Sequence, residues 1–307
     1  MSDLEKKVES SYEGIVIREF LKEELGLSSR LIRGAAIEKR ILVNNNPVRM
    51  RQVLHKGDIV VVKLQRKESQ NIIPQKMDLD IVYEDEDILI LNKPPYLVVH
   101  PTRSYPLGTL ANGVLNYFNE SNQNCIVRLV SRLDMNTSGL IIIAKNQFAH
   151  MYLSKEMKEN NLEKRYLAIV HGHMKEKVGT INLPIYKPEE DNENSKFQRI
   201  VDERGQDSIT HYKVIESFGD SDLVECLLET GRTHQIRVHL SYLGHQIYGD
   251  TLYGYGDKEE ELIKRQALHA YGLNFKSPRT QKEISIRAEL PEDMKNLINV
   301  LKQKEQV

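Results

Sequence analysis

The stretch that most constrains the fold is an apolar run, Leu140–Ala144, that directly follows a polar loop, residues 131–139. The run is rich in β-branched residues and predicts a buried strand. The loop carries Arg132 and, two residues later, Asp134, followed by small residues that favour tight turns. A carboxylate on a loop held between strands is a common position for a catalytic group. From these residues alone, a local turn hydrogen bond from Asp134 and an ion pair with Arg132 form the simpler interpretation.

Length and composition are those of a globular protein with two domains. The chain has 307 residues, of which 40% are hydrophobic and 28% charged, enough for a well-buried core. No run approaches the length of a membrane span, and the first residues show no secretory signal. Two distant cysteines, Cys125 and Cys226, predict a reducing compartment and no disulfide framework. We therefore expect a cytoplasmic monomer with no membrane partner.

Residues 13–64 are predicted to form a small domain of two helices followed by a short sheet. Apolar residues recur at helical spacing in its first half, and Ser28–Ser29 offers a cap for the second helix. Two strand-like runs follow, Ile41–Val43 and Ile59–Val62. The polar residues before this unit should be frayed. Residues 65–77 are polar, contain a proline and predict a linker.

Positive charge gathers in this small domain, although the whole chain has a formal net charge of −1. Between Ser28 and Lys56 there are seven cations and one anion, Glu38, so the local net charge is +6 (7 − 1). This surplus predicts a surface that faces phosphate groups, and an ordinary solvated face is the alternative. Besides Lys56, the cations are Arg30, Arg33, Lys39, Arg40, Arg49 and Arg51.

The small domain resembles the S-four-type RNA-binding domain, which is named after a small-subunit ribosomal protein. The matching positions are Ser28, Val43-Asn44 and Gly57-Asp58. Arg40 stands near a position where that pattern often has glycine, so the turn is expected to differ. The resemblance implies that the basic side chains of the domain bind RNA.

The remaining residues, 78–303, predict one domain of mixed helices and strands. Its second distinctive string, residues 229–240, contains two arginines and two histidines. Four histidines in this part of the chain could be metal ligands: His234, His239, His245 and His269. Their spacings match no helical histidine pair, and no cysteine or carboxylate falls at zinc-site spacing, so no metal site is predicted. The competing interpretation is that Arg232 and Arg237 bind an anion.

Two strings in this domain resemble the signature blocks of the RluA-type pseudouridine synthases. One is Arg132–Gly139 followed by a strand, and the other is Gly231–His239. Shorter blocks, Asn92-Lys93-Pro94 and Lys164-x-Tyr166, are also present, and the resemblance spans roughly residues 80–295. It implies an α+β fold whose catalytic domain is a mixed, mainly antiparallel sheet with flanking helices.

The implied activity is the isomerisation of uridine to pseudouridine in a structured RNA, with large-subunit ribosomal RNA favoured over transfer RNA. The base is detached from its ribose and rejoined through carbon. Because this involves no redox change and no net hydrolysis, we expect no cofactor. The sequence agrees, since it has no glycine-rich phosphate loop and no zinc pattern.

The resemblance also implies roles for single residues. Asp134 matches the catalytic nucleophile, and Arg132 beside it helps to displace the target base. Tyr166 packs against that base and is the proposed base for proton transfer. The first arginine of the second string, Arg232, contacts the catalytic aspartate. The expected pocket-lining residues are Leu133, Ile236, Asn92 and Lys93, whereas His234 and His239 are expected to be structural.

The chain departs from the family pattern at two positions, and two other classes of function are possible alternatives for it. Ser131 stands where the family usually has histidine, and Tyr96 where glycine is frequent. The first departure would suit a non-catalytic RNA-binding or ribosome-assembly protein that retains the fold. Retention of Asp134, Tyr166 and Arg232 together argues against that class. A retaining glycosidase would need a second carboxylate opposite Asp134, and no loop supplies an obvious one.

Overall fold

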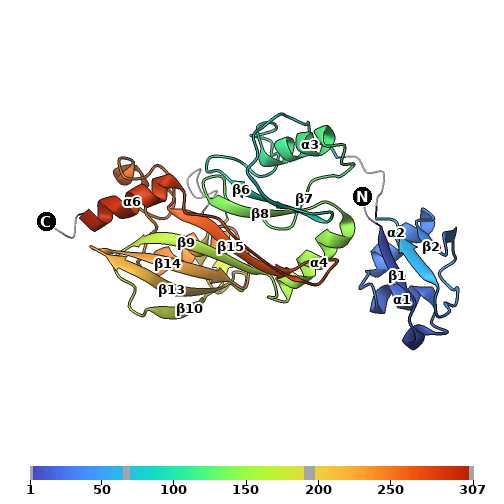
Figure 1. Ribbon diagram of the computed structural model, residues 1–307. Coiled ribbons are helices and arrows are strands. Elements are labelled where there is room, and N and C mark those ends of the chain that lie inside the picture. Colours follow the sequence, from blue (N-terminus) through green and yellow to red (C-terminus); the bar gives the residue numbers. More distant parts are fainter. Residues whose placement is uncertain (1–2, 65–69, 190–197, 304–307) are drawn as a thin grey trace.

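The computed structural model describes residues 3–64, 70–189 and 198–303, which form a small part and a large part (Figure 1). The small part is a four-stranded antiparallel sheet in the order β1-β4-β2-β3, with two helices. Its elements are β1 (Leu4–Lys7), α1 (Ile17–Glu23), α2 (Ser29–Ile37), β2 (Ile41–Val43), β3 (Asn46–Pro47) and β4 (Ile59–Val62), with a short 3-10 turn at Ser10–Tyr12. The predicted order of two helices and a sheet is confirmed, and Ser28 caps α2 by accepting a hydrogen bond from the Leu31 amide at 3.3 Å.

The prediction of a frayed start was wrong from Leu4 onward. The strand β1 pairs with β4 along its whole length, from Leu4 opposite Val62 to Lys7 opposite Ile59. Leu4 and Val8 are buried in the core of the small part. A polar, charged strand can be stable at the edge of a sheet because only one of its faces needs to be apolar. The small sheet therefore begins before residue 13.

The predicted linker is packed where the structure describes it. Residues 65–69 lie outside the described residues. The amide side chain of Gln70 exchanges two hydrogen bonds with the backbone of Val127, at 2.8 and 3.0 Å. Ile72 is buried in the main core of the large part. Residues 70–77 thus belong to the surface of the large part rather than to a free tether.

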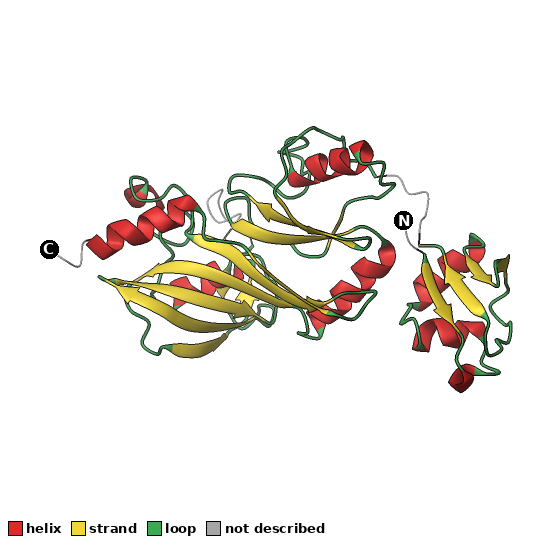
Figure 2. Ribbon diagram, in the orientation of Figure 1, coloured by secondary structure: helices red, strands yellow, loops and turns green. Residues whose placement is uncertain are grey.

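The large part is built on a ten-stranded sheet with helices around it (Figure 2). The main path is β10-β13-β14-β9-β15-β8-β6-β5, with β16 paired to β15 and β7 paired to β8. The strands are β5 (Ile81–Glu84), β6 (Ile88–Lys93), β7 (Arg128–Leu129), β8 (Ser138–Ala144), β9 (Glu163–His171), β10 (Val178–Asn182), β13 (Ile209–Phe218), β14 (Ser221–Leu228), β15 (Leu268–Lys276) and β16 (Glu283–Arg287). A separate pair is β11 (Ile185–Tyr186) with β12 (Ile200–Val201). The helices are α3 (Leu110–Glu120), α4 (Gln147–Lys158), α5 (Gln235–Tyr242), α6 (Glu292–Gln303) and the 3-10 turn Gly256–Glu259.

The apolar run Leu140–Ala144 forms most of strand β8, and all seven residues of the strand are buried. Its side chains alternate between two cores, as expected for a strand covered on both faces. Ile141 and Ile143 join the cluster that includes Leu110 and Phe118 of α3, while Ile142 joins the cluster that includes Leu153 of α4. The strand that follows the Asp134 loop is therefore held in the middle of the fold.

The sheet is mainly antiparallel, as predicted, and its one parallel pairing among the described strands is β15 with β8. This pairing joins Gly139 to Ala270 and brings the two backbones very close together. Gly139 has φ of +115°, and a Cβ there would overlap the backbone of Ala270. Glycine is required here by both conformation and space. The close approach fixes the end of the Asp134 loop against β15.

The two parts touch near the start of α4 (Figure 1). Phe148 of α4 is buried in the same cluster as the small-part residues Phe20 and Leu64. Arg279 donates a hydrogen bond to the backbone carbonyl of Asp3 at 2.8 Å. Within the described ranges, no helix is both long enough and apolar enough to cross a membrane.

Candidate active site

The loop that carries Asp134 is held in place by two buried basic side chains. Lys93, at the end of β6 and 1% exposed, donates to the backbone carbonyls of Pro94, Leu97 and Met135 at 2.8–3.1 Å. Arg265, also 1% exposed, donates to the carbonyl of Asn136 at 3.3 Å. These bonds hold the two residues that follow Asp134, so the carboxylate projects from a rigid turn.

Lys93 is a structural residue rather than a pocket-lining one. Burial, assisted by the charge of Arg265, lowers the pKa of its ammonium group to about 7, against the opposing effect of Asp134. Three cavities lie at or beside Asp134, and neither Lys93 nor Asn92 lines any of them. Asn92 instead donates to the carboxylate of Asp80 at 2.9 Å. The structure therefore does not bring these two predicted residues into the site.

Asp134 pairs with the second arginine of the 229–240 string, not with the first. Nη1 of Arg237 donates to Oδ2 of Asp134 at 3.0 Å. The expectation that Arg232 would make this contact was wrong: its Nε donates to the backbone carbonyl of Asp207 at 3.1 Å, and among the described residues it forms no ion pair. The residue of the string that reaches Asp134 is set by α5, which begins at Gln235 and turns Arg237 inward.

Arg237 is itself held by a second carboxylate. Its Nε and Nη2 donate to the two oxygens of Asp250 at 2.7 and 2.8 Å, a bidentate pair. Asp250 is fully buried and also accepts from the amides of Leu252 and Tyr253 at 2.9 and 3.1 Å. Burial opposes the charge of Arg237, but its bonds to Asp250 and Asp134 raise its pKa above the ordinary arginine value. The guanidinium is therefore a fixed positive charge beside Asp134.

His234 lies next to this pair and was missed as a site residue. Its Nε2 is 3.8 Å from Oδ2 of Asp134, and its Nδ1 is 2.9 Å from the hydroxyl of Tyr253. Burial lowers the pKa of His234, although Asp134 pulls it upward. The lowered pKa favours the neutral form of the ring. Its left-handed backbone, φ +59°, at the start of α5 gave no signal in the sequence.

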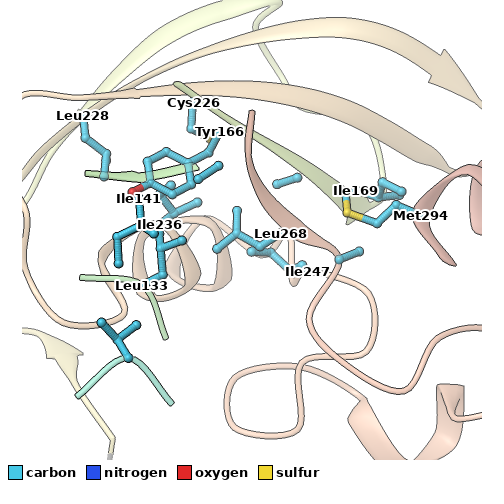
Figure 3. Packing of buried hydrophobic residues seen from close by; sticks show 14 of the residues in the cluster. Leu133, Ile141, Tyr166, Ile169, Cys226, Leu228, Ile236, Ile247, Leu268 and Met294 are labelled. Carbon is cyan, nitrogen blue, oxygen red and sulfur yellow. The ribbon is translucent and has the colours of Figure 1, made fainter. Parts of the chain in front are cut away.

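A narrow slot of about 60 Å³ leads to the Asp134 carboxylate. Tyr166, Leu133 and Ile236 line it as predicted, together with Leu228 and Leu268. Figure 3 shows the side chains of Leu133, Leu228 and Ile236 around the Tyr166 ring. Among the described residues, Asp134 is the only carboxylate that lines the slot. The slot therefore holds one acid among the described residues, with apolar side chains and arginine side chains both in its lining.

The phenol of Tyr166 is held in its protonated form. Burial raises its pKa, and the nearby negative charge of Asp134 raises it further. At neutral pH such a phenol can donate a hydrogen bond, but it holds its proton and does not supply the phenolate that a general base requires. Tyr166 lines the slot from strand β9.

The mouth of the slot is basic and opens toward two larger cavities. One, of about 700 Å³, is lined by Lys158 and Lys164, and burial lowers the pKa of Lys164 to about 8. The other, of about 520 Å³, extends toward Tyr186 and Lys187. Arg132 and Arg232 line all three spaces. Both predicted arginines therefore lie where the slot meets the two larger cavities.

The predicted basic surface of the small part is mostly exposed. Arg30 and Arg33 project from α2, and Lys39, Arg49 and Arg51 are exposed nearby. These five form no ion pair within the described residues, so their charges face solvent. Arg40 differs, because it donates to Glu38 at 2.8 Å and to the carbonyl of Lys63 at 2.6 Å. Its guanidinium fastens the end of α2 to β4.

The histidines considered as metal ligands are engaged in other ways. Both ring nitrogens of His239 are bonded, to Thr210 at 2.9 Å and to the carbonyl of Leu183 at 3.0 Å, which confirms a structural role. Nδ1 of His269 is 2.9 Å from the hydroxyl of Ser138, and His245 faces the carbonyl of His171. In the described part of the chain, no three histidine, cysteine or acidic side chains are grouped so that they could hold a metal ion.

Comparison with known proteins identifies relatives for both parts. A family model described as RNA pseudouridylate synthase matches residues 87–242, and a model of the RluD ribosomal pseudouridine synthase N-terminal domain matches residues 4–60. The uncharacterized RNA pseudouridine synthase YjbO of Bacillus subtilis is 42% identical over 277 residues, which cover 90% of this chain and 95% of that protein. The ribosomal large subunit pseudouridine synthase D of Neisseria meningitidis is 36% identical over 275 residues, covering 86% and 72%.

A solved structure is also similar. The human RNA pseudouridylate synthase domain containing 1 superposes with a TM-score of 0.56 at 27% sequence identity. The match covers 73% of this chain and 95% of the human chain. The likeness in sequence and in fold therefore extends over most of the large part.

Proposed function

We propose that Asp134 is the catalytic nucleophile of this chain, which belongs to the RNA pseudouridylate synthase family and is an isomerase that acts on RNA. We also propose that its substrate is large-subunit ribosomal RNA. The observation that carries the first proposal is the geometry of Asp134. It is the only acid that lines the slot among the described residues, and Arg237 donates a hydrogen bond to it at 3.0 Å. A carboxylate acts as a nucleophile in its ionised form, and the hydrogen bond from Arg237 fixes its orientation.

The route of the substrate follows from the mouth of the slot. A uridine within folded RNA has to leave its stack, at a cost of a few kcal/mol. Arg132 would occupy the space that the base leaves, and Arg232 would hold the strand at the entrance. The ring of Tyr166 would then stack on the base, a contact worth about 1–3 kcal/mol. The raised pKa of Tyr166 favours this stacking role over that of a proton acceptor.

The reaction then needs only the groups of the slot. Asp134 attacks the ribose carbon, and the uracil leaves with the pair of electrons that bound it. The uracil turns and rejoins the same carbon through a ring carbon, which displaces Asp134. The proton lost by that ring carbon is balanced by the proton gained by the freed ring nitrogen. Apolar walls from Leu133 and Ile236 keep water from trapping the ribose.

The second carboxylate near Asp134 does not fit a retaining glycosidase. Asp250 is fully buried, and both of its oxygens accept hydrogen bonds from Arg237. It also does not line the slot. A glycosidase acid would have to reach the leaving group from the slot wall. The arrangement supports an isomerase that keeps its detached base.

The choice of ribosomal RNA rests on relatives whose names state that substrate, such as the Neisseria enzyme. An enzyme of that RNA would act in the cytoplasm. The test is to map pseudouridines in ribosomal and transfer RNA from a strain that lacks the gene and from the restored strain. We expect positions in large-subunit ribosomal RNA to lose pseudouridine and to regain it. A loss confined to transfer RNA would contradict the proposed substrate.

The basic face of the small part is proposed to bind the same RNA through its phosphates. Arg30 and Arg33 are exposed on one helix, and neither is engaged by a carboxylate of the described residues. Changing both to glutamate should weaken RNA binding and flatten its dependence on salt. Lys22→Glu, an exposed lysine of α1, is the control. Equal effects of the control and the double variant would remove this face from the interface.

A further inference from the structure

A cavity of about 520 Å³ lies beside the slot and has a lining of its own. It shares only Arg132, Gly231, Arg232 and Thr233 with the spaces around Asp134. The rest of its wall comes from β11 and from residues 187, 199 and 204–206. Neither the catalytic function nor the family resemblance assigned a role to these residues.

The lining of this cavity is strongly cationic. Of the eleven described residues that line it, five are positively charged and none is acidic. The cations are Arg132, Lys187, Arg199, Arg204 and Arg232. Arg132 and Arg232 form no ion pair with any carboxylate in the part of the chain that the structure describes. These two guanidinium groups therefore present positive charge to whatever occupies the cavity.

One of the five cations helps to build the wall. Arg204 forms a bidentate pair with Asp202 at 2.8 and 2.9 Å, and its guanidinium lies 4.4 Å from the centre of the Tyr186 ring. Tyr186 pairs with Ile200 across the β11–β12 ladder. A side chain at Gly205 would overlap the backbone of Ile185, so these segments are in close contact. The cavity has a formed wall and is not a gap between loose side chains.

We propose that this cavity binds the phosphodiester backbone of the unpaired RNA strand next to the target uridine. The inference rests on the proposed function, because Arg132 and Arg232 join the cavity to the slot that would receive the base. A strand that delivers one nucleotide into the slot must continue on either side of it. Phosphate is the anion that this strand presents at every nucleotide, and guanidinium groups bind it through paired N–H donors.

The test is the salt dependence of RNA binding by the full chain. The protein carries Asp134→Asn in every arm, so that no turnover occurs, and the probe is an end-labelled oligouridine. The change Lys187→Gln with Arg199→Gln should reduce the slope of log affinity against log salt by about 1.4, since each phosphate contact to a single strand contributes about 0.7. Lys187→Gln alone, at an exposed side chain, should remove about half of that.

The matched control is Lys276→Gln with Arg287→Gln, two exposed cations on β15 and β16 that line none of the three cavities. The control should keep the parent slope. Oligouridine with uncharged methylphosphonate linkages should bind the parent and the variant alike. An unchanged slope in both cavity variants, or an equal drop in the control, would overturn the proposal.

These readouts also separate the cavity from the proposed function. Binding is measured without isomerisation, so a wild-type protein that forms no pseudouridine would refute the proposed function while leaving a reduced slope to support the cavity. Pseudouridine formation together with an unchanged slope would refute the cavity alone.

Discussion

Replacing Arg237 with methionine should destabilise the large part severely and also remove its activity, for two separable reasons. The guanidinium satisfies Asp250, which is fully buried, by two hydrogen bonds of 2.7 and 2.8 Å. Removing one partner of a buried ion pair costs about 3–5 kcal/mol, because the other charge is left without compensation. For a domain of this size, about 2–4 °C per kcal/mol corresponds to a melting temperature lower by roughly 6–20 °C.

The double variant Arg237→Met with Asp250→Leu distinguishes stability from catalysis. It removes both buried charges and fills the space, so most of the lost stability should return. Activity should stay about 10²–10³-fold below wild type in both variants, since Asp134 has lost its preorganised guanidinium. Calorimetry would measure the melting temperatures, and single-turnover pseudouridine formation would measure the rates.

The matched control is Arg279→Met, which breaks another bidentate arginine–carboxylate pair, with Asp87 at 2.9 and 3.0 Å. This variant should lose stability but should keep its single-turnover rate while folded. The reasoning is refuted if the Arg237–Asp250 double variant regains both stability and rate. It is equally refuted if the control loses as much rate as Arg237→Met does.

Three further predictions concern the walls and supports of the site. Tyr166→Phe should keep most of the activity in single-turnover assays because the aromatic ring remains. Tyr166→Leu should lose about 1–3 kcal/mol of substrate stabilisation in the same assays. An inactive Tyr166→Phe variant would favour the proton-transfer role of the tyrosine. Gly139→Ala should lower the free energy of unfolding by at least about 1–3 kcal/mol, because the backbone there is left-handed and lies against Ala270. Gly34→Ala in helix α2 has open space around it and should cause no such loss in the same denaturant unfolding experiment. Lys93 has a pKa of about 7 in the folded protein and a higher pKa in the unfolded chain, so the unfolded chain binds more protons. The free energy of unfolding of the wild type, relative to Lys93→Met, should therefore rise from about pH 7 to pH 10. A difference between the two proteins that does not change with pH would contradict the lowered pKa of Lys93.

The strand at the centre of the fold was predictable because one local signal specified it. An apolar β-branched run can be buried only where both faces are covered, and β8 is covered by α3 and α4. Its parallel pairing with β15 was not predictable, since it depends on a partner that lies 131 residues further along the chain at Ser138 and His269. The same limit explains the edge strand β1, whose partner β4 is distant in sequence.

The candidate site divides along similar lines. The string around Asp134 predicted the acid, and the apolar residues Leu133 and Ile236 do line its slot. The choice of arginine depended on geometry, because α5 begins only at Gln235 and turns Arg237 toward the acid while Arg232 stays at the mouth. The contribution of Asp250 depended on a loop that returns to Arg237 from 13 residues away. No local pattern marks such a contact.

The most direct measurement is the single-turnover rate of purified Asp134→Asn protein on RNA from a strain that lacks the gene. The amide keeps the shape of the side chain but removes the charge that Arg237 holds at 3.0 Å. We expect no pseudouridine above background while the affinity for that RNA stays close to the wild-type value. A rate within about tenfold of wild type, equivalent to less than about 1.4 kcal/mol of the barrier, would contradict Asp134 as the nucleophile.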